Sequence, residues 1–268
     1  SGLVRVENPR LEALGEDVLY HLDLGTKTHD LPATSGDIKF VCVGGSPNRM
    51  RAFAQLVHKE LGLEGDGEEL ADVCVGTDRY AECLSYCLFS QQHGMGIPST
   101  SIMLHELIEL LHHAKCRDVT TIRIGTSGGL EHKHQQLRLS LRFAGVEAGS
   151  VVITDRAVAA RFQPRFEQVV LGDAVLRGTD LDGGLVEGLL DCSKGIPDVP
   201  ALVGHTMCTY DFYEEQWPAS ASFHGQGRSD GALRSFSSGK KLEHLKRAQA
   251  AGVRNTEVEP TAPAALSG

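Results

Sequence analysis

Short apolar runs that end in turn residues recur along the chain. The clearest is IKFVCV at residues 38–43, which stops at Gly44 and Gly45. Runs of this length, bounded by turn residues, predict buried β-strands. Further runs of the same kind lie at residues 119–124, 151–154 and 201–207.

Stretches with helical spacing of apolar residues separate these runs. Residues 48–61 have this spacing, with Pro47 at their start, which is typical of a helix. A second helix is expected after Pro98 and a third over residues 240–252. Because strands and helices alternate, we expect an α/β fold with a largely parallel sheet.

Three segments do not fit this alternation. Residues 130–144 and 215–224 are polar or irregular, and each is expected to be a surface loop. Residues 260–268 hold two prolines and have no periodicity, which predicts a frayed tail. We find no internal repeat or linker, so a single domain over residues 1–259 is expected.

Composition and charge narrow the class of protein. The 268 residues are 41% hydrophobic and 23% charged, as in soluble globular proteins. The net charge is −9 without a basic block, which argues against a nucleic-acid or anionic-membrane partner. Since the sequence also lacks a membrane-length apolar run and a signal-peptide pattern, we expect a cytoplasmic protein.

The cysteines and histidines do not form a metal-binding pattern. Seven scattered cysteines without a CxxC pair suit a reducing compartment. Cys74 and Cys83 bracket Arg79, which leaves redox control open beside the more ordinary role of packing. The neighbouring histidines His112 and His113 have no further ligand at zinc spacing, so no metal site is expected.

Two glycine-rich turns are the first candidate site. In GGSPNR, the amides after Gly45 and the side chain of Arg49 would surround an anion at a helix N-terminus. The second turn, GTSGG, follows Arg123 at the end of another strand, where α/β folds place ligands. Neither turn matches a nucleotide-binding motif. The alternative is a pair of tight turns that need glycine for their backbone conformation.

Two further groups carry candidate chemistry. Phe212, Gln226 and Arg228 combine a ring, an amide and a guanidinium, which suits a planar heterocycle; a core phenylalanine beside a surface loop is the alternative. Glu257 and Glu259 could bind sugar hydroxyls or simply face solvent. GTSGG is not GxSxG, so the nucleophile elbow of a hydrolase is absent.

Taken in order, these segments resemble the vertebrate uridine phosphorylases. The resemblance runs from about residue 9 to residue 259, and HLDLGTKTH and ELLHHAKC are most similar to the second paralogue. The blocks that carry it include KFVCVGGSPNRM, GTDRY, HGMGIPS, IRIGTSGG, MCTYDFYE and GQGR. It implies a three-layer αβα sandwich with a central mixed, mostly parallel sheet. It also implies reversible phosphorolysis of uridine and deoxyuridine to uracil and a sugar 1-phosphate, in pyrimidine salvage and catabolism, by a homodimer with shared active sites and no cofactor.

The resemblance also implies a role for each candidate residue. The phosphate-binding residues would be Gly45, Arg49, Arg79, Arg123, Ile124, Gly125 and Thr126. The uridine-binding residues would be His21, Ser127, Gly128, Phe212, Gln226, Gly227, Arg228, Glu257, Val258 and Glu259. His21 and Arg79 would come from the partner subunit. Arg228 and Gln226 would stabilise the uracil leaving group while Arg123 positions the attacking phosphate, and these three are the expected catalytic residues.

Several departures from the family pattern support an alternative. Residues 130–144 are additional, and residues 215–224 separate Phe212 from Gln226. AECLSYCLFSQQ replaces the family's strand before HGMG. The family continues beyond Glu259, so the chain is expected to be C-terminally truncated relative to it. The alternative is a catalytically impaired or inactive member that binds ligand or pairs with intact subunits; an altered base preference is a third possibility.

Overall fold

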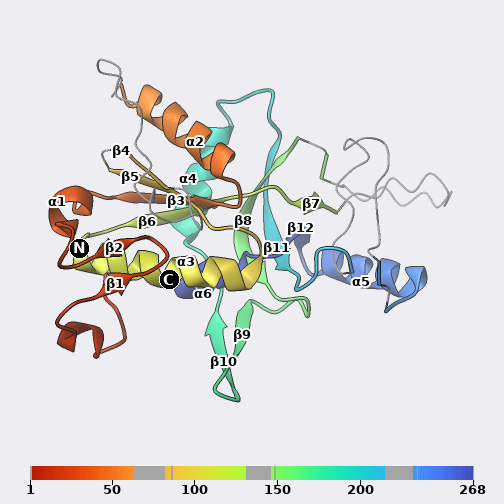
Figure 1. Cartoon of the computed structure of the whole chain (residues 1–268). Coiled ribbons are helices and arrows are strands. Elements are labelled where there is room, and N and C mark those ends of the chain that lie inside the picture. Colours follow the sequence, from red (N-terminus) through yellow and green to blue (C-terminus); the bar gives the residue numbers. More distant parts are fainter. Residues whose placement is uncertain are drawn as a thin grey trace. The chain divides into compact units, whose positions relative to one another are not determined.

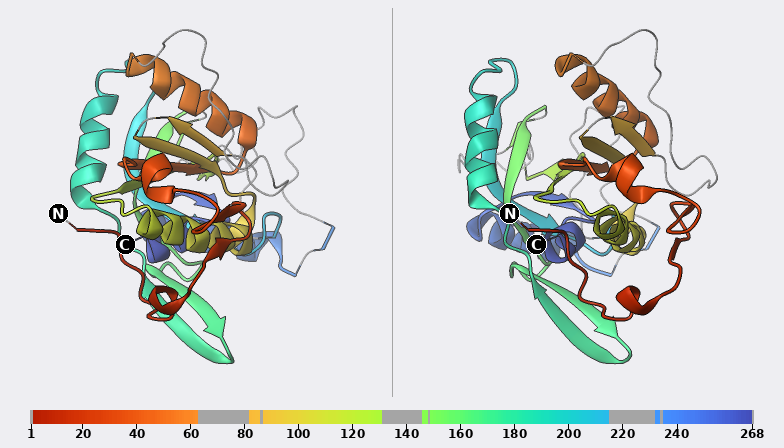
Figure 2. Two further views of the ribbon diagram at one scale, coloured as in Figure 1. Left: turned by 60° about the vertical axis from the view of Figure 1, so that its left-hand side comes forward. Right: turned by 90° about the vertical axis from the view of Figure 1, so that its left-hand side faces the viewer.

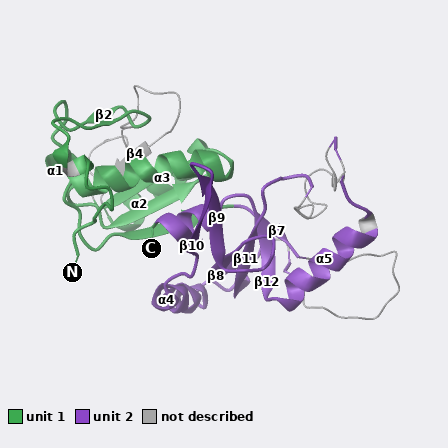
Figure 3. Cartoon of the chain, turned by 90° about the horizontal axis from the view of Figure 1, so that it is seen from below, with its two compact units in different colours: residues 1–125, 267 green, residues 126–266, 268 purple. Residues whose placement is uncertain are grey.

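Two compact units make up the chain in the computed structural model. The structure describes residues 2–62, 82–85, 87–130, 146–147, 149–214, 232–233 and 235–267. Unit 1 holds residues 1–125 and unit 2 holds residues 126–266 (Figure 3). Each unit has its own four-stranded sheet.

Unit 1 is built around a sheet with the strand order β4-β5-β3-β6. The central strand β3 is parallel to β5 and β6, whereas β4 is antiparallel to β5. Helices α2 and α3 lie on opposite faces of this sheet, which gives three layers (Figure 1). The elements are η1 (Leu11–Ala13), β1 (Val18–Leu19), β2 (Leu24–Gly25), α1 (Leu31–Ser35), β3 (Phe40–Gly44), α2 (Pro47–Glu60), β4 (Glu82–Ser85), β5 (Leu88–Gln92), α3 (Gly96–His113) and β6 (Thr120–Ile124).

The alternation of side chains sorts the residues of this sheet onto its two faces. Cys42 of β3 packs with Met50 of α2 in a buried apolar cluster. Its neighbour Val43 therefore faces the opposite side, towards α3. Val43 pairs with Gln91 of β5 and with Arg123 of β6. Gln91 and Arg123 thus belong to one row of residues near the carboxyl ends of three parallel strands.

The predicted elements of unit 1 are confirmed, with one shifted boundary. β3, β6 and α2 occupy the expected segments, and Pro47 is the first residue of α2. Helix α3 begins at Gly96, so the prediction that it starts after Pro98 is wrong. Pro98 lies inside the first turn, where its missing N–H would have had no intrahelical acceptor.

Unit 2 contains a second sheet, with the strand order β7-β12-β11-β8. Strands β8, β11 and β12 are parallel, and β7 is antiparallel to β12. The elements are β7 (Gly128–Gly129), β8 (Val151–Val158), β9 (Arg165–Val170), β10 (Asp173–Gly178), α4 (Gly183–Ser193), β11 (Ala201–Cys208), α5 (Ser238–Ala250), β12 (Val253–Glu257) and α6 (Thr261–Leu266).

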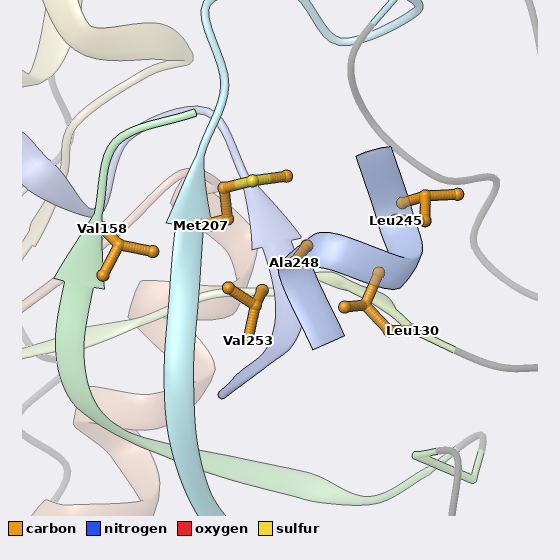
Figure 4. Packing of buried hydrophobic residues seen from close by; sticks show 6 residues of the cluster. All are labelled: Leu130, Val158, Met207, Leu245, Ala248 and Val253. Atoms are coloured by element: carbon orange, nitrogen blue, oxygen red, sulfur yellow. The ribbon is translucent and has the colours of Figure 1, made fainter. Parts of the chain in front are cut away.

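Helix α5 packs against this sheet through a buried apolar cluster (Figure 4). The cluster consists of Leu130, Val158, Met207, Leu245, Ala248 and Val253. The predicted strands at residues 151–154 and 201–207 are confirmed as β8 and β11, and the predicted helix at residues 240–252 is confirmed as α5. Both units therefore show the predicted α/β class with mixed, mostly parallel sheets.

A two-stranded hairpin of β9 and β10 extends from the end of β8 (Figure 2). Leu171 and Gly172 join its strands, and both have positive φ angles, of 53° and 97°. Two such residues in a row are the requirement of the type I′ turn that matches strand twist. Leucine at the first position hides this signal in the sequence, and the hairpin was not predicted.

The prediction of a frayed tail is wrong for most of its length, because residues 261–266 form α6. Thr261 and Ala262 are buried, and the N–H of Ala264 donates to the carbonyl oxygen of Pro260. The two prolines do not prevent this helix. Pro260 precedes it and Pro263 lies in its first turn, where a proline costs no hydrogen bond. Of the loops predicted at residues 130–144 and 215–224, all residues but Leu130 lie outside the described part of the chain, and Leu130 belongs to the buried cluster under α5.

Candidate functional site

The carboxyl edge of the unit 1 sheet carries the first predicted turn. β3 ends at Gly44, the exposed Gly45 follows, and α2 begins at Pro47 with Arg49 in its first turn. A Cβ on Gly45 would lie 3.1 Å from the carbonyl oxygen of Gly94, so the backbone approaches the segment after β5 closely. The turn therefore leaves little room for a side chain at Gly45, and it also presents a helix N-terminus towards the edge.

Strand β6 brings the second predicted turn to the same edge. Arg123 and Ile124 are half-buried, and Gly125 is exposed at the end of unit 1. Ile124 packs against the apolar cluster under α2, so only its backbone is available to a ligand. Unit 1 thus brings Gly45, Arg123 and Gly125 together at the ends of adjacent parallel strands.

His93, which was not among the residues predicted from the sequence, completes this edge. Its backbone N–H donates to the carbonyl oxygen of Gly44 at 2.8 Å, and its side chain is fully buried. Nδ1 lies 3.2 Å from Oγ1 of Thr100. Nε2 is buried and has no hydrogen-bond partner among the described residues. The available signal was the HGMG block, which supplies a histidine directly after β5.

The surroundings of His93 keep its ring neutral. Burial is the main cause that lowers its pKa to about 4, and the positive charge of Arg123 lowers it further, with a smaller contribution from Arg49. At neutral pH the ring therefore has one N–H donor and one acceptor nitrogen. Two guanidinium groups, a neutral ring and a helix N-terminus together suit an anion.

In unit 2, the GTSGG turn continues with Thr126, Ser127 and Gly128. Thr126 and Ser127 are exposed, whereas Gly128 is buried in β7 and pairs with Thr256 of β12. The side-chain amide of Asn255 donates to Oγ of Ser127 at 2.7 Å. β12 therefore fixes the position of the Ser127 hydroxyl.

The two predicted carboxylates lie at the carboxyl end of β12. Glu257 and Glu259 are only 5% and 6% exposed, and Val258 between them is half-buried. The N–H and the hydroxyl of Thr209 both donate to the carbonyl oxygen of Glu257, at 2.8 and 3.1 Å. The interpretation of a solvent-facing glutamate pair is therefore wrong. Buried carboxylates at a strand end are suitable acceptors for hydroxyl groups.

Phe212 lies in the segment that follows β11. It is 55% exposed, and its ring makes an edge contact with Tyr213 at 5.2 Å between centroids. The interpretation of Phe212 as a core residue is therefore wrong, and its exposed aromatic ring could stack on a planar ligand. Gln226, Gly227 and Arg228, as well as Arg79, lie outside the described residues.

His21, the remaining candidate, is held by helix α3 of unit 1. Its Nδ1 lies 2.5 Å from Oε1 of Glu106, and Oε2 accepts the backbone N–H groups of His21 and Leu22 at 2.8 and 3.1 Å. A single carboxylate thus fixes both the loop and the imidazole. Because Glu106 contacts Nδ1, it directs Nε2 away from itself.

The described residues do not include a group of three histidine, cysteine or acidic side chains that could hold a metal ion. His113 instead pairs with Asp17 at 2.7 Å. Within the same described part of the chain, we find no helix that is long and apolar enough to cross a membrane. Cys74 and the side chain of Cys83 lie outside the described residues, whereas burial raises the pKa of the Cys42 thiol to about 12.

Comparisons with known proteins identify the family of the chain. The Phosphorylase superfamily matches residues 39–264, which include both sheets. Uridine phosphorylase 2 of Mus musculus is 61% identical over 99% of this chain and 75% of the relative, and that of Homo sapiens is 59% identical over 99% and 76%. A uridine phosphorylase structure from Schistosoma mansoni, in complex with uracil, superimposes with a TM-score of 0.82 at 37% identity, over 97% of this chain and 81% of the other. The chain therefore belongs to the Phosphorylase superfamily and, within it, to the uridine phosphorylases.

Proposed function

We propose that the chain catalyses the reversible phosphorolysis of uridine to uracil and ribose 1-phosphate. The observation that carries this proposal is the edge of the unit 1 sheet, where Arg49, Arg123 and the buried Nε2 of His93 surround a glycine turn. Relatives with 61% and 59% identity bear the name uridine phosphorylase, and solved relatives bind uracil and thymidine.

In the proposed reaction, phosphate itself is the nucleophile. One of its oxygens bonds to the anomeric carbon while the glycosidic bond breaks, and the bonding electrons leave with N1 of uracil. Arg49 and Arg123 bind and orient the phosphate, and the amides after Gly45 and around Gly125 complete its shell, with Ile124 contributing only backbone. The ring of His93 donates from Nε2 without adding a charge.

The nucleoside is assigned to the groups of unit 2. Glu257 and Glu259 accept hydrogen bonds from the ribose hydroxyls, with Val258 contributing its backbone, and Phe212 stacks on the base. Thr126 contacts phosphate, while Ser127 and Gly128 line the nucleoside. From the family resemblance, the remaining polar contacts to uracil come from Gln226, Gly227 and Arg228, and Arg228 and Gln226 stabilise the anionic leaving group.

The finer assignments follow from the same resemblance. We assign the 5′-hydroxyl of ribose to His21 and a further phosphate contact to Arg79, both from the partner subunit of a homodimer. Deoxyuridine is the proposed second substrate, no cofactor is involved, and the cytoplasm is the proposed location. A family match that includes residues of both units supports one functional domain.

The release of uracil from uridine by the purified chain tests this proposal. We expect release, followed by the absorbance of the base, that depends on phosphate and does not occur with sulfate at equal ionic strength. Circular dichroism on the same sample establishes that the chain is folded. A folded chain that does not release uracil at any phosphate concentration would contradict the proposal and favour the alternative, an impaired family member.

A further inference from the structure

A network of hydrogen-bonded side chains crosses the whole sheet of unit 2. Oγ1 of Thr154 on β8 lies 2.6 Å from Oγ1 of Thr206 on β11. The Thr206 hydroxyl donates to Oδ1 of Asn255 on β12 at 2.8 Å. Nδ2 of Asn255 donates to Oγ of Ser127 at 2.7 Å, just before β7. The interior of this network is buried, with Thr206 and Asn255 only 2% and 5% exposed, whereas Ser127 at its end is exposed.

The backbone pairing is irregular where the network crosses β11. The pairing of β11 shifts register between His205 and Thr206 against β12, and between Gly204 and Thr206 against β8. Such irregularities re-aim a side chain within a sheet. Here both shifts involve Thr206, the residue whose hydroxyl connects β8 with β12.

The chemistry of the Asn255 amide fixes which group donates in each hydrogen bond of the network. An amide oxygen only accepts hydrogen bonds and an amide nitrogen only donates them. Since Thr206 uses its proton on Oδ1 of Asn255, Thr154 must be the donor in the first contact. At the other end, Ser127 accepts from Asn255 through a lone pair. The hydroxyl proton of Ser127 is therefore not used within this network, and Ser127 lies at an exposed position.

We infer that Asn255 and Thr206 are positioning residues that fix Ser127 as an outward hydrogen-bond donor to an acceptor oxygen of the bound nucleoside. This inference rests on the proposed function, which places Ser127 in the nucleoside site. Neither positioning residue touches the substrate. They determine whether the serine donates or accepts, and so which kind of atom the site recognises.

The Asn255→Asp variant tests this polarity with almost no change in shape. A carboxylate accepts at both oxygens, so Ser127 must turn its proton inward and the outward donor is lost. We expect the dissociation constant for uridine, measured by calorimetry without phosphate, to rise about tenfold. Ser127→Ala should produce the same rise, and the double variant should be no weaker than either single variant, because both changes remove one hydrogen bond.

Two further variants separate positioning from folding. Thr179→Val removes a buried hydroxyl elsewhere in unit 2, which donates to the carbonyl oxygen of Ala157, and should leave uridine affinity unchanged. Thr206→Val deprives Oδ1 of Asn255 of its donor, so the amide can turn and accept the Ser127 proton; uridine affinity should fall in the same direction as in Asn255→Asp. This variant keeps the inference testable if Asn255→Asp does not fold.

The outcomes distinguish this inference from the proposed function. Unchanged uridine affinity in Ser127→Ala, or in both Asn255→Asp and Thr206→Val, would overturn the inference, as would a folded chain that does not bind uridine. If affinity shifts as expected but the wild-type chain does not release uracil with phosphate, the inference stands and the proposed function fails.

Discussion

The two sheets of this chain end in opposite charges. At the carboxyl edge of the unit 1 sheet lie the guanidinium groups of Arg49 and Arg123, whereas the carboxylates of Glu257 and Glu259 lie at the carboxyl end of β12 in unit 2. Both edges are built from parallel strands, the place where α/β folds bind ligands. In the proposed function the same architecture serves two kinds of ligand, because the strand ends carry cations for an anion in one unit and acceptors for hydroxyls in the other.

The two edges also differ in how they use buried polar groups. In unit 1, His93 avoids adding a third positive charge beside the two arginines because its ring is neutral. In unit 2, buried hydroxyls and an amide connect neighbouring strands and lead to the exposed Ser127. The first edge is therefore tuned by charge and the second by the direction of hydrogen bonds.

The largest expected effect tests the cationic edge. Arg123→Ala should lower kcat/KM for phosphate about a thousandfold, because it removes a charged fork from the attacking nucleophile. The dissociation constant for uridine alone should change far less. Arg51→Ala, on the exposed side of the same α2 helix that carries Arg49, is the matched control and should retain activity. Equal losses of phosphate and uridine affinity in Arg123→Ala would contradict the assignment of phosphate to the unit 1 edge and of the nucleoside to the groups of unit 2.

The pH dependence of stability tests the neutral state of His93. Above its ordinary pKa of 6.5 the ring is neutral in both the folded and the unfolded chain. As the pH falls from 6.5 to about 4, the unfolded chain binds a proton that the folded chain does not, so the free energy of unfolding decreases. This loss is about 3 kcal/mol for one group. Denaturant titrations should show a correspondingly smaller loss in His93→Asn; identical pH profiles would contradict the burial of a neutral ring.

The carboxylate edge is tested by Glu259→Gln. The amide keeps one acceptor oxygen but loses the charge, so KM for uridine should rise about thirtyfold while KM for phosphate changes little. Glu243→Gln on the exposed side of α5 is the control and should behave as the wild type. A rise in KM for phosphate that equals the rise for uridine would show that Glu259 does not belong to a separate ribose site.

A smaller effect sharpens the role of the Nε2 donor. His93→Asn removes a donor at the position of Nε2, whereas the longer His93→Gln keeps one there. We expect KM for phosphate to rise about tenfold in His93→Asn and only two- to threefold in His93→Gln. If both variants have the same KM, the imidazole acts through packing against the Gly45 turn and not through its donor.

Local patterns in the sequence predicted much of the frame but not the pairing of distant groups. β3 and α2 were predictable because apolar spacing and Pro47 are local signals. β5 was not, since its buried positions include the polar Ser90 and Gln91. The contact between Ser127 and Asn255 joins residues 128 positions apart, so it depends on strand order, which periodicity does not report.

Among the site residues, the same limit applies. The glycine turns and the Glu257–Glu259 pair were found from residue type and position, but their burial was not. His93 escaped notice because its importance depends on Gly44 and Arg123 lying on adjacent strands, which only the assembled sheet shows. The helix over residues 261–266 was not predicted because two prolines argued against it. Both lie at the start of the helix, where a proline costs no hydrogen bond.

A crystal structure of the chain with phosphate and a non-reacting uridine analogue tests the central claim most directly. We expect phosphate within hydrogen-bond distance of Arg49, Arg123 and Nε2 of His93, and the ribose hydroxyls on Glu259. Phosphate bound away from the edge formed by β5, β3 and β6, or a ribose that does not contact the end of β12, would contradict the account.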